Sequence, residues 1–396
     1  MQKNCKNCEL NFTITQEDQV FYNKISVPAP TFCHDCRLRR RFIFRNERIL
    51  YRRNCDLCKK SMVTVYHKDA PYTVYCQKCW WSDKWDGIEY GQDYDFEKPF
   101  FEQFKKLMMV APRMNLLKSS DNVNCEYANF VAHSKDCYFI FNSGGGGGNE
   151  NCYFGWAIDD CKDSFDINSS KQCIECYDTL NSNRSNKIFF SKNTTDTLSS
   201  NFMYDCRNCI DCIGCVELRN KSYNILNKQY TKEEYLKKKK ELDLGSYKNT
   251  IKFKEKVYEL YIKYPKKYAN IVKSENIIGD NILNSKNCFY AFDSYKAEDC
   301  KYILRVINSR NSYDMCSNMD SELCIDGLAV LRSSLIKFST TAIDCMNSSY
   351  VDSCFNCSNI FGSISLRKKE YCILNKQYTK EEYEELVAKI IKHMGG

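Results

Sequence analysis

Eight cysteines near the start of the chain have the spacing that holds a tetrahedral metal ion. They form four Cys-x-x-Cys pairs before residue 80. A tight turn with this spacing directs two thiolates at one ion, and two such pairs complete a closed four-thiolate site. The sequence therefore predicts two bound Zn²⁺ ions rather than eight ordinary buried cysteines. The predicted ligands are Cys5, Cys8, Cys33 and Cys36 for the first ion, and Cys55, Cys58, Cys76 and Cys79 for the second.

Zinc at such sites is expected to be structural. Four thiolates leave no coordination position open for water or substrate. The ion would instead substitute for a hydrophobic core too small to fold by itself. Hairpin-like segments are expected between the pairs, over residues 12–22 and between 63–66 and 72–75.

A family resemblance accompanies the first two pairs. The pattern of Cys5-x2-Cys8, Phe12, Glu17, Phe21-Tyr22, Pro28 and Cys33-x2-Cys36-Arg37 resembles the small probable zinc-binding (treble-clef) domain of many bacterial proteins, over about residues 1–45. The run from Phe44 to Trp81, with the repeats described below, resembles uncharacterised cysteine-rich zinc-ribbon proteins of candidate-phylum bacteria. The resemblance implies zinc sites and an architecture, and no activity.

In a treble clef the second Cys-x-x-Cys begins a helix, which predicts a helix from His34 to about Asn46. Arginines recur along it at spacings of three and four residues and so share one face. Guanidinium groups match phosphate oxygens, so this face is a candidate nucleic-acid contact, with a solvated helix face as the alternative. The candidate residues are Arg37, Arg40, Arg41, Arg45, Arg48, Arg52 and Arg53. His34 is not needed as a ligand and is expected at the surface.

Composition points to a folded protein of a reducing compartment. A chain of 396 residues exceeds what one hydrophobic core usually covers, so two or three domains are expected, and a hydrophobic content of 43% indicates that most of it folds. No apolar run is long enough for a membrane span, and the N-terminus lacks the apolar stretch of a signal peptide. We therefore expect a cytoplasmic location, where the 26 cysteines act as metal ligands or small buried side chains rather than as disulfides.

The net charge of +8 is unevenly distributed. Residues 1–60 contain 13 basic and 6 acidic side chains, and residues 221–273 contain 15 and 6. Residues 121–220 are acidic, with 8 basic and 14 acidic side chains. A basic segment favours an acidic or phosphate-bearing partner, although a charge run is often only a solvated face.

The body of the chain is duplicated. Residues 226–235 and 374–383 are the same decapeptide, LNKQYTKEEY, and the match extends upstream at the same offset. Gly214 aligns with Gly362, and Asp163-Ser164-Phe165-Asp166 aligns with Asn311-Ser312-Tyr313-Asp314. Two copies of one unit therefore span about residues 121–235 and 272–383.

Each copy repeats a short theme of a polar residue, then Cys or Ser, then an aromatic or β-branched residue, every 9 to 15 residues. Short strands with polar corners and little helical pattern predict a parallel β-solenoid with small side chains stacked inside. An antiparallel β-sandwich is the alternative. Both copies end in a helix with a capping box, Thr231-x-x-Glu234 and Thr379-x-x-Glu382.

Other chemistry is poorly supported. Cys206, Cys209, Cys212 and Cys215 fall every third residue, but lack the last spacing and the proline of an iron–sulfur run, so a corner role or a partial metal site is favoured. The pentaglycine at 144–148 has no Lys-Ser/Thr after it and is expected to be a flexible loop tip, not a phosphate loop. With four histidines and no hydrolase motif, the chain is not expected to be an enzyme.

The predicted fold is mainly β, with two N-terminal treble-clef or zinc-ribbon modules followed by a duplicated parallel β-solenoid with capping helices. The predicted function is zinc binding with contact to an RNA or DNA backbone through the arginines above and the lysines of 237–273; the alternative is a protein-interaction scaffold that uses the solenoid surface. No membrane contact is expected. The predicted domains are 1–54, 55–90, a connecting helix in 91–120, 121–245, a basic helical linker at 246–271, and 272–396.

Overall fold

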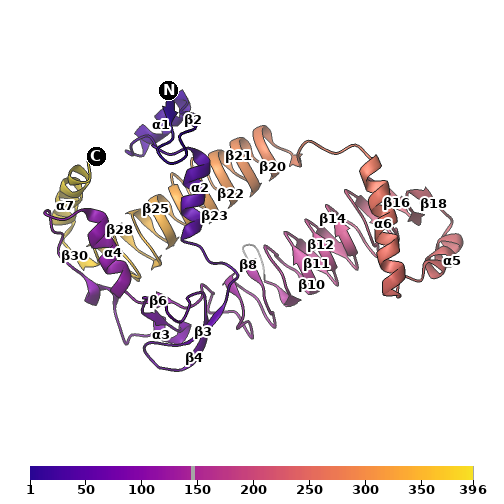
Figure 1. Ribbon diagram of the computed structural model, residues 1–396, viewed down its shortest axis with the longest axis horizontal. Coiled ribbons are helices and arrows are strands. Elements are labelled where there is room, and N and C mark those ends of the chain that lie inside the picture. The colour runs from indigo at the N-terminus through magenta and orange to yellow at the C-terminus, as the bar shows by residue number, and fades with distance from the viewer. Residues whose placement is uncertain (144–147, 396) are drawn as a thin grey trace. The chain divides into compact units, whose positions relative to one another are not determined.

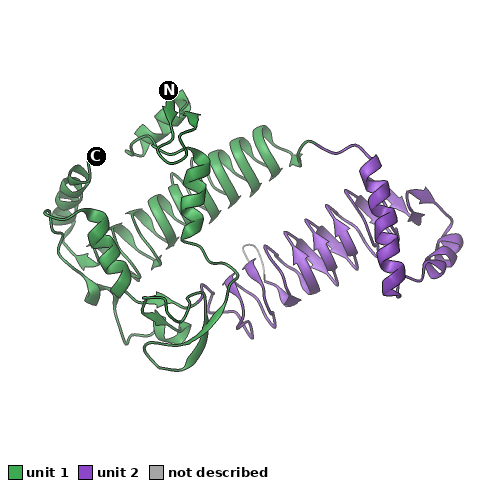
Figure 2. Cartoon of the chain, in the orientation of Figure 1, with its two compact units in different colours: residues 1–115, 268–396 green, residues 116–267 purple. Residues whose placement is uncertain are grey.

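The computed structural model describes residues 1–143 and 148–395, so the predicted pentaglycine loop tip lies almost wholly outside the described residues. The described protein is mainly β, as predicted. It divides into two compact units (Figure 2). Unit 1 contains residues 1–115 and 268–396, and unit 2 contains residues 116–267.

Each unit contains a ladder of short parallel strands (Figure 1). In the first ladder, which lies in unit 2, the strands are β7 (Asn129–Val131), β8 (Phe141–Ser143), β9 (Glu150–Tyr153), β10 (Lys162–Asn168), β11 (Lys171–Ile174), β12 (Tyr177–Leu180), β13 (Asn183–Asn186), β14 (Phe189–Lys192), β15 (Arg207–Ile210) and β16 (Arg219–Ser222). In the second ladder, which lies in unit 1, they are β19 (Ile271–Val272), β20 (Glu275–Leu283), β21 (Lys286–Tyr295), β22 (Glu298–Ile307), β23 (Tyr313–Met319), β24 (Ile325–Leu331), β25 (Ser334–Ile343), β26 (Met346–Ser349), β27 (Cys354–Phe355), β28 (Ser358–Phe361) and β29 (Glu370–Ile373).

The pairing register advances by 12 residues at most steps. Phe165 pairs with Tyr177 in the first ladder, and Tyr313 pairs with Ile325 in the second, both in parallel. An antiparallel sandwich is therefore wrong for these strands. Because parallel strands need a crossover between them, each 12-residue step must contain its own return path.

A three-residue pattern lies inside the 12-residue step. Every third residue is buried, and the residue just before each buried one has positive φ. The buried set includes Cys161, Ser164, Ile167 and Ser170, and the positive-φ set includes Asp160, Asp163, Asp166 and Ser169. Asn and Asp tolerate the left-handed conformation better than other non-glycine residues, which explains why they are frequent along the ladders.

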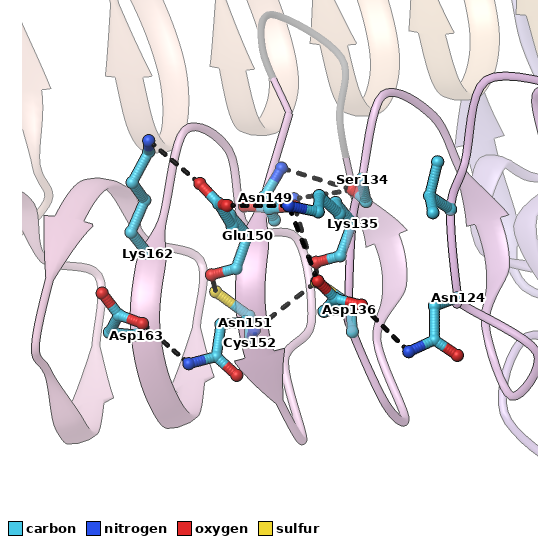
Figure 3. A network of polar contacts seen from close by, with 12 residues as sticks. Asn124, Ser134, Lys135, Asp136, Asn149, Glu150, Asn151, Cys152, Lys162 and Asp163 are labelled. Carbon is cyan, nitrogen blue, oxygen red and sulfur yellow. Dashed lines mark hydrogen bonds and ion pairs between the residues drawn. The ribbon is translucent and has the colours of Figure 1, made fainter.

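Side chains also link successive steps. On the outside of the first ladder, Asn151 donates from Nδ2 to Asp163 Oδ1 at 2.7 Å, and Lys162 forms an ion pair with Glu150 at 3.1 Å (Figure 3). Inside it, the Ser164 hydroxyl oxygen accepts a hydrogen bond from the backbone N–H of Cys176 at 3.1 Å. Small interior side chains thus satisfy backbone groups that the short strands leave unpaired.

Both ladders end in the same way. An antiparallel hairpin, β17 (Asn224–Ile225) with β18 (Lys228–Gln229) or β29 with β30 (Lys376–Gln377), precedes a helix. These helices are α5 (Lys232–Leu242) and α7 (Lys380–His393), and both have the predicted capping boxes. Asn227 and Asn375 bond both backbone groups of Val216 and Ile364, respectively, at 2.8 Å. They substitute for a further strand at the last step.

A second helix packs on each ladder end at an equivalent glycine. In unit 2, α6 (Tyr247–Lys263) brings Phe253 against Gly214; in unit 1, α4 (Phe100–Val110) brings Phe100 against Gly362. Both glycines have positive φ, +66° and +62°. The helix α4 is the predicted connecting helix, and α6 falls in the predicted basic linker. No described helix is both long and apolar enough to cross a membrane.

Candidate metal centres and the arginine helix

The first four predicted zinc ligands come together in a hairpin and a helix start. Strands β1 (Gln2–Asn4) and β2 (Asn11–Thr13) pair in antiparallel fashion, with Cys5 and Cys8 in the turn between them. Cys33 is the N-cap of α2 (His34–Ile43), and Cys36 lies in its first turn. The helix predicted from His34 is confirmed, although it ends three residues earlier than expected.

The second set repeats this design. Strands β3 (Tyr51–Asn54) and β4 (Ser61–Thr64) form the hairpin that holds Cys55 and Cys58, and Cys76 is the N-cap of α3 (Gln77–Trp80), which contains Cys79. The two turns match in detail. The N–H of the residue after each first pair, Glu9 or Lys59, donates to the carbonyl oxygen of the pair's first cysteine at 2.9 Å, and both residues have positive φ.

Both predicted hairpin-like segments are wrong. Residues 16–24 form α1 (Gln16–Lys24), because Thr15 and Asp18 make a capping box that outweighs the strand-like pattern. Residues 63–66 do not pair with 72–75: β4 pairs with β3, and β5 (Val74–Tyr75) pairs in parallel with β6 (Arg113–Met114). In the first case a local helix signal outweighs the strand-like pattern. In the second case each segment pairs with a strand outside the stretch between the two cysteine pairs.

The geometry of both cysteine sets fits a tetrahedral metal ion. Within each set all four Sγ atoms lie within 4.8 Å of one another. The Sγ atoms of Cys8 and Cys33 are 3.7 Å apart, and those of Cys58 and Cys76 are 3.9 Å apart. A zinc ion with metal–sulfur distances of about 2.3 Å requires sulfur–sulfur edges of about 3.8 Å. A disulfide would need about 2.05 Å, so these thiols are spaced for a metal ion.

Backbone N–H groups and a side-chain amide point at the sulfurs. The N–H of Cys33 lies 3.2 Å from Cys5 Sγ, and the N–H of Cys76 lies 3.3 Å from Cys55 Sγ. The side-chain amide of Asn7 donates to Cys36 Sγ at 3.2 Å. A hydrogen bond from the backbone of Lys60 is the largest cause that lowers the pKa of the Cys58 thiol, to about 7. Such donors stabilise thiolates, the form in which cysteine binds zinc.

The arginines of α2 face carboxylates of the second ladder. Arg37 Nε lies 2.9 Å from Asp314, and Arg41 Nη1 lies 3.1 Å from Asp314 and 2.9 Å from Asp326. Arg40 also pairs with Asp326. Arg37 and Arg41 are only 6% and 4% exposed, and Asp314 is 1% exposed. Burial disfavours the charged form of Arg41, but the two carboxylates outweigh it and raise the pKa of this guanidinium above its usual value.

Aromatic contacts surround this ion-pair cluster. The ring of Phe21, from α1, stacks on Tyr313 with centroids 3.9 Å apart. The predicted surface residue His34 stacks on Tyr302 at 5.0 Å, and the guanidinium of Arg37 lies over the same ring at 5.1 Å. The first four-cysteine module therefore docks on β22, β23 and β24 through one apolar and one charged patch, both from segments flanking the four cysteines.

The remaining predicted nucleic-acid residues have varied surroundings. The side chain of Arg45 is 2% exposed, pairs with Glu47 and donates to the carbonyl oxygen of Leu328 at 3.2 Å. Arg53 pairs with Asp56 at 3.0 Å, whereas Arg48 and Arg52 are exposed. Nucleic-acid contact through this region stays a prediction. Two of its arginines, Arg37 and Arg41, are buried against carboxylates of the same chain.

The second four-cysteine module docks on the second ladder within the same unit. Arg367 donates to the carbonyl oxygens of Trp80 at 2.6 Å and Trp85 at 2.8 Å. Its guanidinium lies over the Trp85 ring, 4.6 Å from the centroid. Arg113 forms a buried ion pair with Asp352 at 2.9 Å. These docking residues were missed by sequence reasoning, because nothing in the sequence matches an arginine to a carboxylate more than 200 positions away.

The other cysteines have a different environment. Cys206, Cys209, Cys212 and Cys215 are at most 1% exposed and belong to no candidate metal group among residues 1–143 and 148–395. Each thiol donates to the carbonyl oxygens two residues before it and nine residues after it. They are interior residues of four successive triplets.

Comparison with known proteins gives no assignment. No protein-family model matches the chain, and no curated protein matches it significantly. The function must be argued from the geometry.

Proposed function

We propose that the chain is a zinc-stabilised, non-enzymatic scaffold that binds protein partners on a parallel β-solenoid. The observation that carries this proposal is the docking of α2 on the second ladder, where Arg37 and Arg41 are buried against Asp314 and Asp326. In this proposal the arginine stripe is an interface within the chain, and the ladder is a surface that recognises helices.

The solenoid part of the proposal is supported by the 12-residue register and the buried residue at every third position. Four triplets per step would make a coil with four short sides, with Cys, Ser and Thr stacked inside. The six domains predicted from the sequence remain the proposed division of the chain.

The zinc part is supported by the two four-cysteine groups and their sulfur spacing. Two Zn²⁺ ions would be held by Cys5, Cys8, Cys33 and Cys36, and by Cys55, Cys58, Cys76 and Cys79. Each ion would fix the angle between a hairpin and the helix that follows. A reducing cytoplasm suits this proposal, because all 26 cysteines are free of disulfides.

A second candidate is nucleic-acid binding through unit 2. Helix α5 carries exposed Lys237, Lys239 and Lys240, and Tyr258 of α6 is 57% exposed. Lysines beside exposed aromatic rings could contact phosphates and stack on bases. This candidate relies on α5 and α6 rather than on the arginines of α2.

One purification tests both candidates. The full chain, prepared without chelator, is expected to contain about two zinc ions and to show no salt-sensitive binding to mixed-sequence RNA or DNA. A measured content of less than about one zinc per chain would overturn the proposal that the two four-cysteine groups bind zinc. Binding that falls steeply with salt and is lost when Lys237, Lys239 and Lys240 become alanine, but not when Lys286 and Lys296 do, would favour the second candidate.

A further inference from the structure

On the outer surface of each ladder, residues at equivalent places in successive steps form a column. All of these residues have positive φ, and the two columns have the same composition. In both copies the column consists of two aromatic residues, two aspartates and two aromatic residues. The first column contains Phe139, Phe154, Asp166, Asp178, Phe190 and Phe202, and the second contains Tyr290, Tyr302, Asp314, Asp326, Phe338 and Tyr350.

The aromatic pairs have the same geometry in both columns. Phe190 and Phe202 stack at 4.8 Å with planes 15° apart, and Phe338 and Tyr350 stack at 4.9 Å and 18°. Bulky residues rarely adopt positive φ, and Asn or Asp would meet the backbone requirement at lower cost. The aromatic residues therefore need a reason beyond the turn, and in the second column the reason is docking.

Helices of unit 1 contact the second column from Tyr302 to Tyr350, whereas its first residue, Tyr290, touches His34 but remains 44% exposed. Its first aromatic pair contacts His34, its aspartates bind the α2 arginines, and its last aromatic residue, Tyr350, contacts Phe100 of α4 at 5.1 Å. In the first column only the last part is covered. Phe202 contacts Phe253 of α6 at 5.3 Å, and Lys254 pairs with Asp178 at 3.2 Å.

The rest of the first column is open. Just before the first strand of the ladder, the ring of Tyr127 stacks on Phe139 with centroids 6.0 Å apart. Among the described residues, no hydrogen bond, ion pair or ring contact from outside the ladder reaches Phe154 or Asp166. Phe165, beside the column, is 46% exposed, whereas its equivalent Tyr313 under the zinc module is 5% exposed. Phe154 is 48% exposed, and Asp166 is exposed where Asp314 is buried.

We propose that this open surface, formed by Phe139, Phe154, Phe165, Asp166 and Tyr177, binds an arginine-bearing helix of a partner protein. This inference rests on the proposed scaffold function and names the partner's chemistry. Asp166 and Asp178 stand where Asp314 and Asp326 receive arginines, so the partner helix presents arginines four residues apart. The pair of Asp178 with Lys254 is half exposed and therefore weak, so it does not block the site.

One difference between the copies determines which helix each column binds. Lys301, which forms an ion pair with Asp18 of α1 at 2.8 Å, is replaced by Tyr153 at the equivalent position of the first ladder. The first surface thus lacks the cation that receives the acidic helix start of the zinc module. The partner is therefore expected to place an apolar or aromatic residue against Tyr153. The chain's own zinc module, which has Asp18 there, is expected to prefer the second column, where Lys301 pairs with it.

The test uses a fluorescent peptide with the sequence of residues 33–46, carrying Cys33→Ser and Cys36→Ser. A hydrocarbon link between positions 39 and 43, both exposed in α2, keeps the short peptide helical. Anisotropy is measured on titration with the zinc-loaded full chain. The comparison variants are Asp166→Asn with Asp178→Asn, and, as a matched control with the same charge change nearby, Asp160→Asn with Asp163→Asn.

The expected result is saturable binding to the wild-type chain and to the control, weakened at least about tenfold in the Asp166→Asn, Asp178→Asn variant. A peptide with Arg37→Glu and Arg41→Glu is expected not to bind. Absence of binding, or equal weakening in both variants, overturns the inference. Self-association of the wild-type chain that the same variant abolishes would assign the surface to a second copy instead. Zinc content near two per chain in these samples separates failure here from failure of the scaffold's metal sites.

Discussion

At the scale of single residues, cysteine has two separate uses in this chain. Cys79 lies at the start of a helix with three other sulfurs nearby, in the arrangement that binds a metal. Cys215 is fully buried in the first ladder, and its thiol donates to the carbonyl oxygens of Ile213 and Asn224. At the equivalent position of the second copy Ser363 donates to Phe361 in the same way. The interior therefore requires only a small hydrogen-bond donor, whereas the candidate metal site requires sulfur.

This difference predicts opposite results for one substitution at two positions. Cys79→Ser is expected to reduce bound zinc by about one ion per chain, because a hydroxyl is a poor zinc ligand. Cys215→Ser is expected to leave zinc unchanged and to alter the free energy of unfolding by less than about 1.5 kcal/mol. Zinc is measured by elemental mass spectrometry and stability by urea unfolding. Loss of zinc from the Cys215 variant would mean that the ladder cysteines bind metal.

The ion pairs also divide by their exposure. Asp314 is 1% exposed and receives two guanidinium groups, so its removal leaves Arg37 buried without its carboxylate partner and leaves Arg41 with Asp326 alone. Asp344 pairs with Arg332 at the surface, where both side chains are a third to a half exposed. A buried charge that loses its partner is costly, whereas an exposed pair contributes little.

Asp314→Ala is accordingly expected to destabilise the docked first four-cysteine module by about 3–5 kcal/mol. Asp344→Ala is the matched control and is expected to cost no more than about 1 kcal/mol. Hydrogen exchange of the α2 amides, residues 34–43, measures the effect where it occurs. Similar exchange in the two variants would show that the apolar contacts of Phe21 and Tyr22 hold the module without the ion pairs.

At the scale of elements, the parts of the fold with local signals could be predicted. The Cys-x-x-Cys turns, the capped helices α5 and α7, and the duplication all depend on short patterns. The three-residue period could not be predicted with the same ease, because its buried positions accept Cys, Ser, Thr, Ile and Met alike. The period is defined by which residues face the inside of the ladder. A search for alternating hydrophobic residues does not detect it, because many of the inward-facing residues are polar.

The docking of α2 shows a second limit. An arginine stripe has the same appearance in the sequence whether it binds phosphate or carboxylate. Arg37 and its partner Asp314 are 277 residues apart, and Asp314 is one of many aspartates at positive-φ positions. The nearest available signal was internal: Asp314 and Asp326 align with Asp166 and Asp178, between aromatic residues in both copies.

The equivalent glycines allow a prediction about the ladder ends. A Cβ at Gly362 would lie 2.8 Å from the Phe100 ring, at a φ of +62°. Gly362→Ala is therefore expected to cost about 1–2 kcal/mol for the left-handed backbone alone, and to loosen α4. Gly214→Ala should have the same effect on α6. Gly245→Ala is the control, since a Cβ there has open space and no positive φ.

Thermal unfolding with hydrogen exchange of α4 and α6 distinguishes these variants. Each ladder-end variant is expected to increase exchange in the helix that packs on it and to leave the other helix unchanged. A uniform increase in both helices would contradict the view that the two ends are independent structures.

At the scale of the whole molecule, the candidate metal groups among the described residues are confined to unit 1. Both lie within residues 1–80, whereas unit 2, residues 116–267, is built from strand pairs, interior hydrogen bonds and the packing of α5 and α6. In a protein of stacked repeats, each step is stabilised mainly by its neighbours. The stability of unit 2 should therefore not depend on zinc, although the folding of the N-terminal modules should.

Metal removal tests this separation directly. After treatment with a strong chelator, the amides of residues 1–80 are expected to lose protection from hydrogen exchange, because zinc binding and folding are coupled in such small modules. The amides of 150–225 are expected to keep their protection, and zinc added back should restore the N-terminal pattern. Protection of 1–80 that survives confirmed zinc loss would show that docking on the second ladder alone holds these modules. Loss of protection in both regions together would show that unit 2 depends on the zinc modules for its stability.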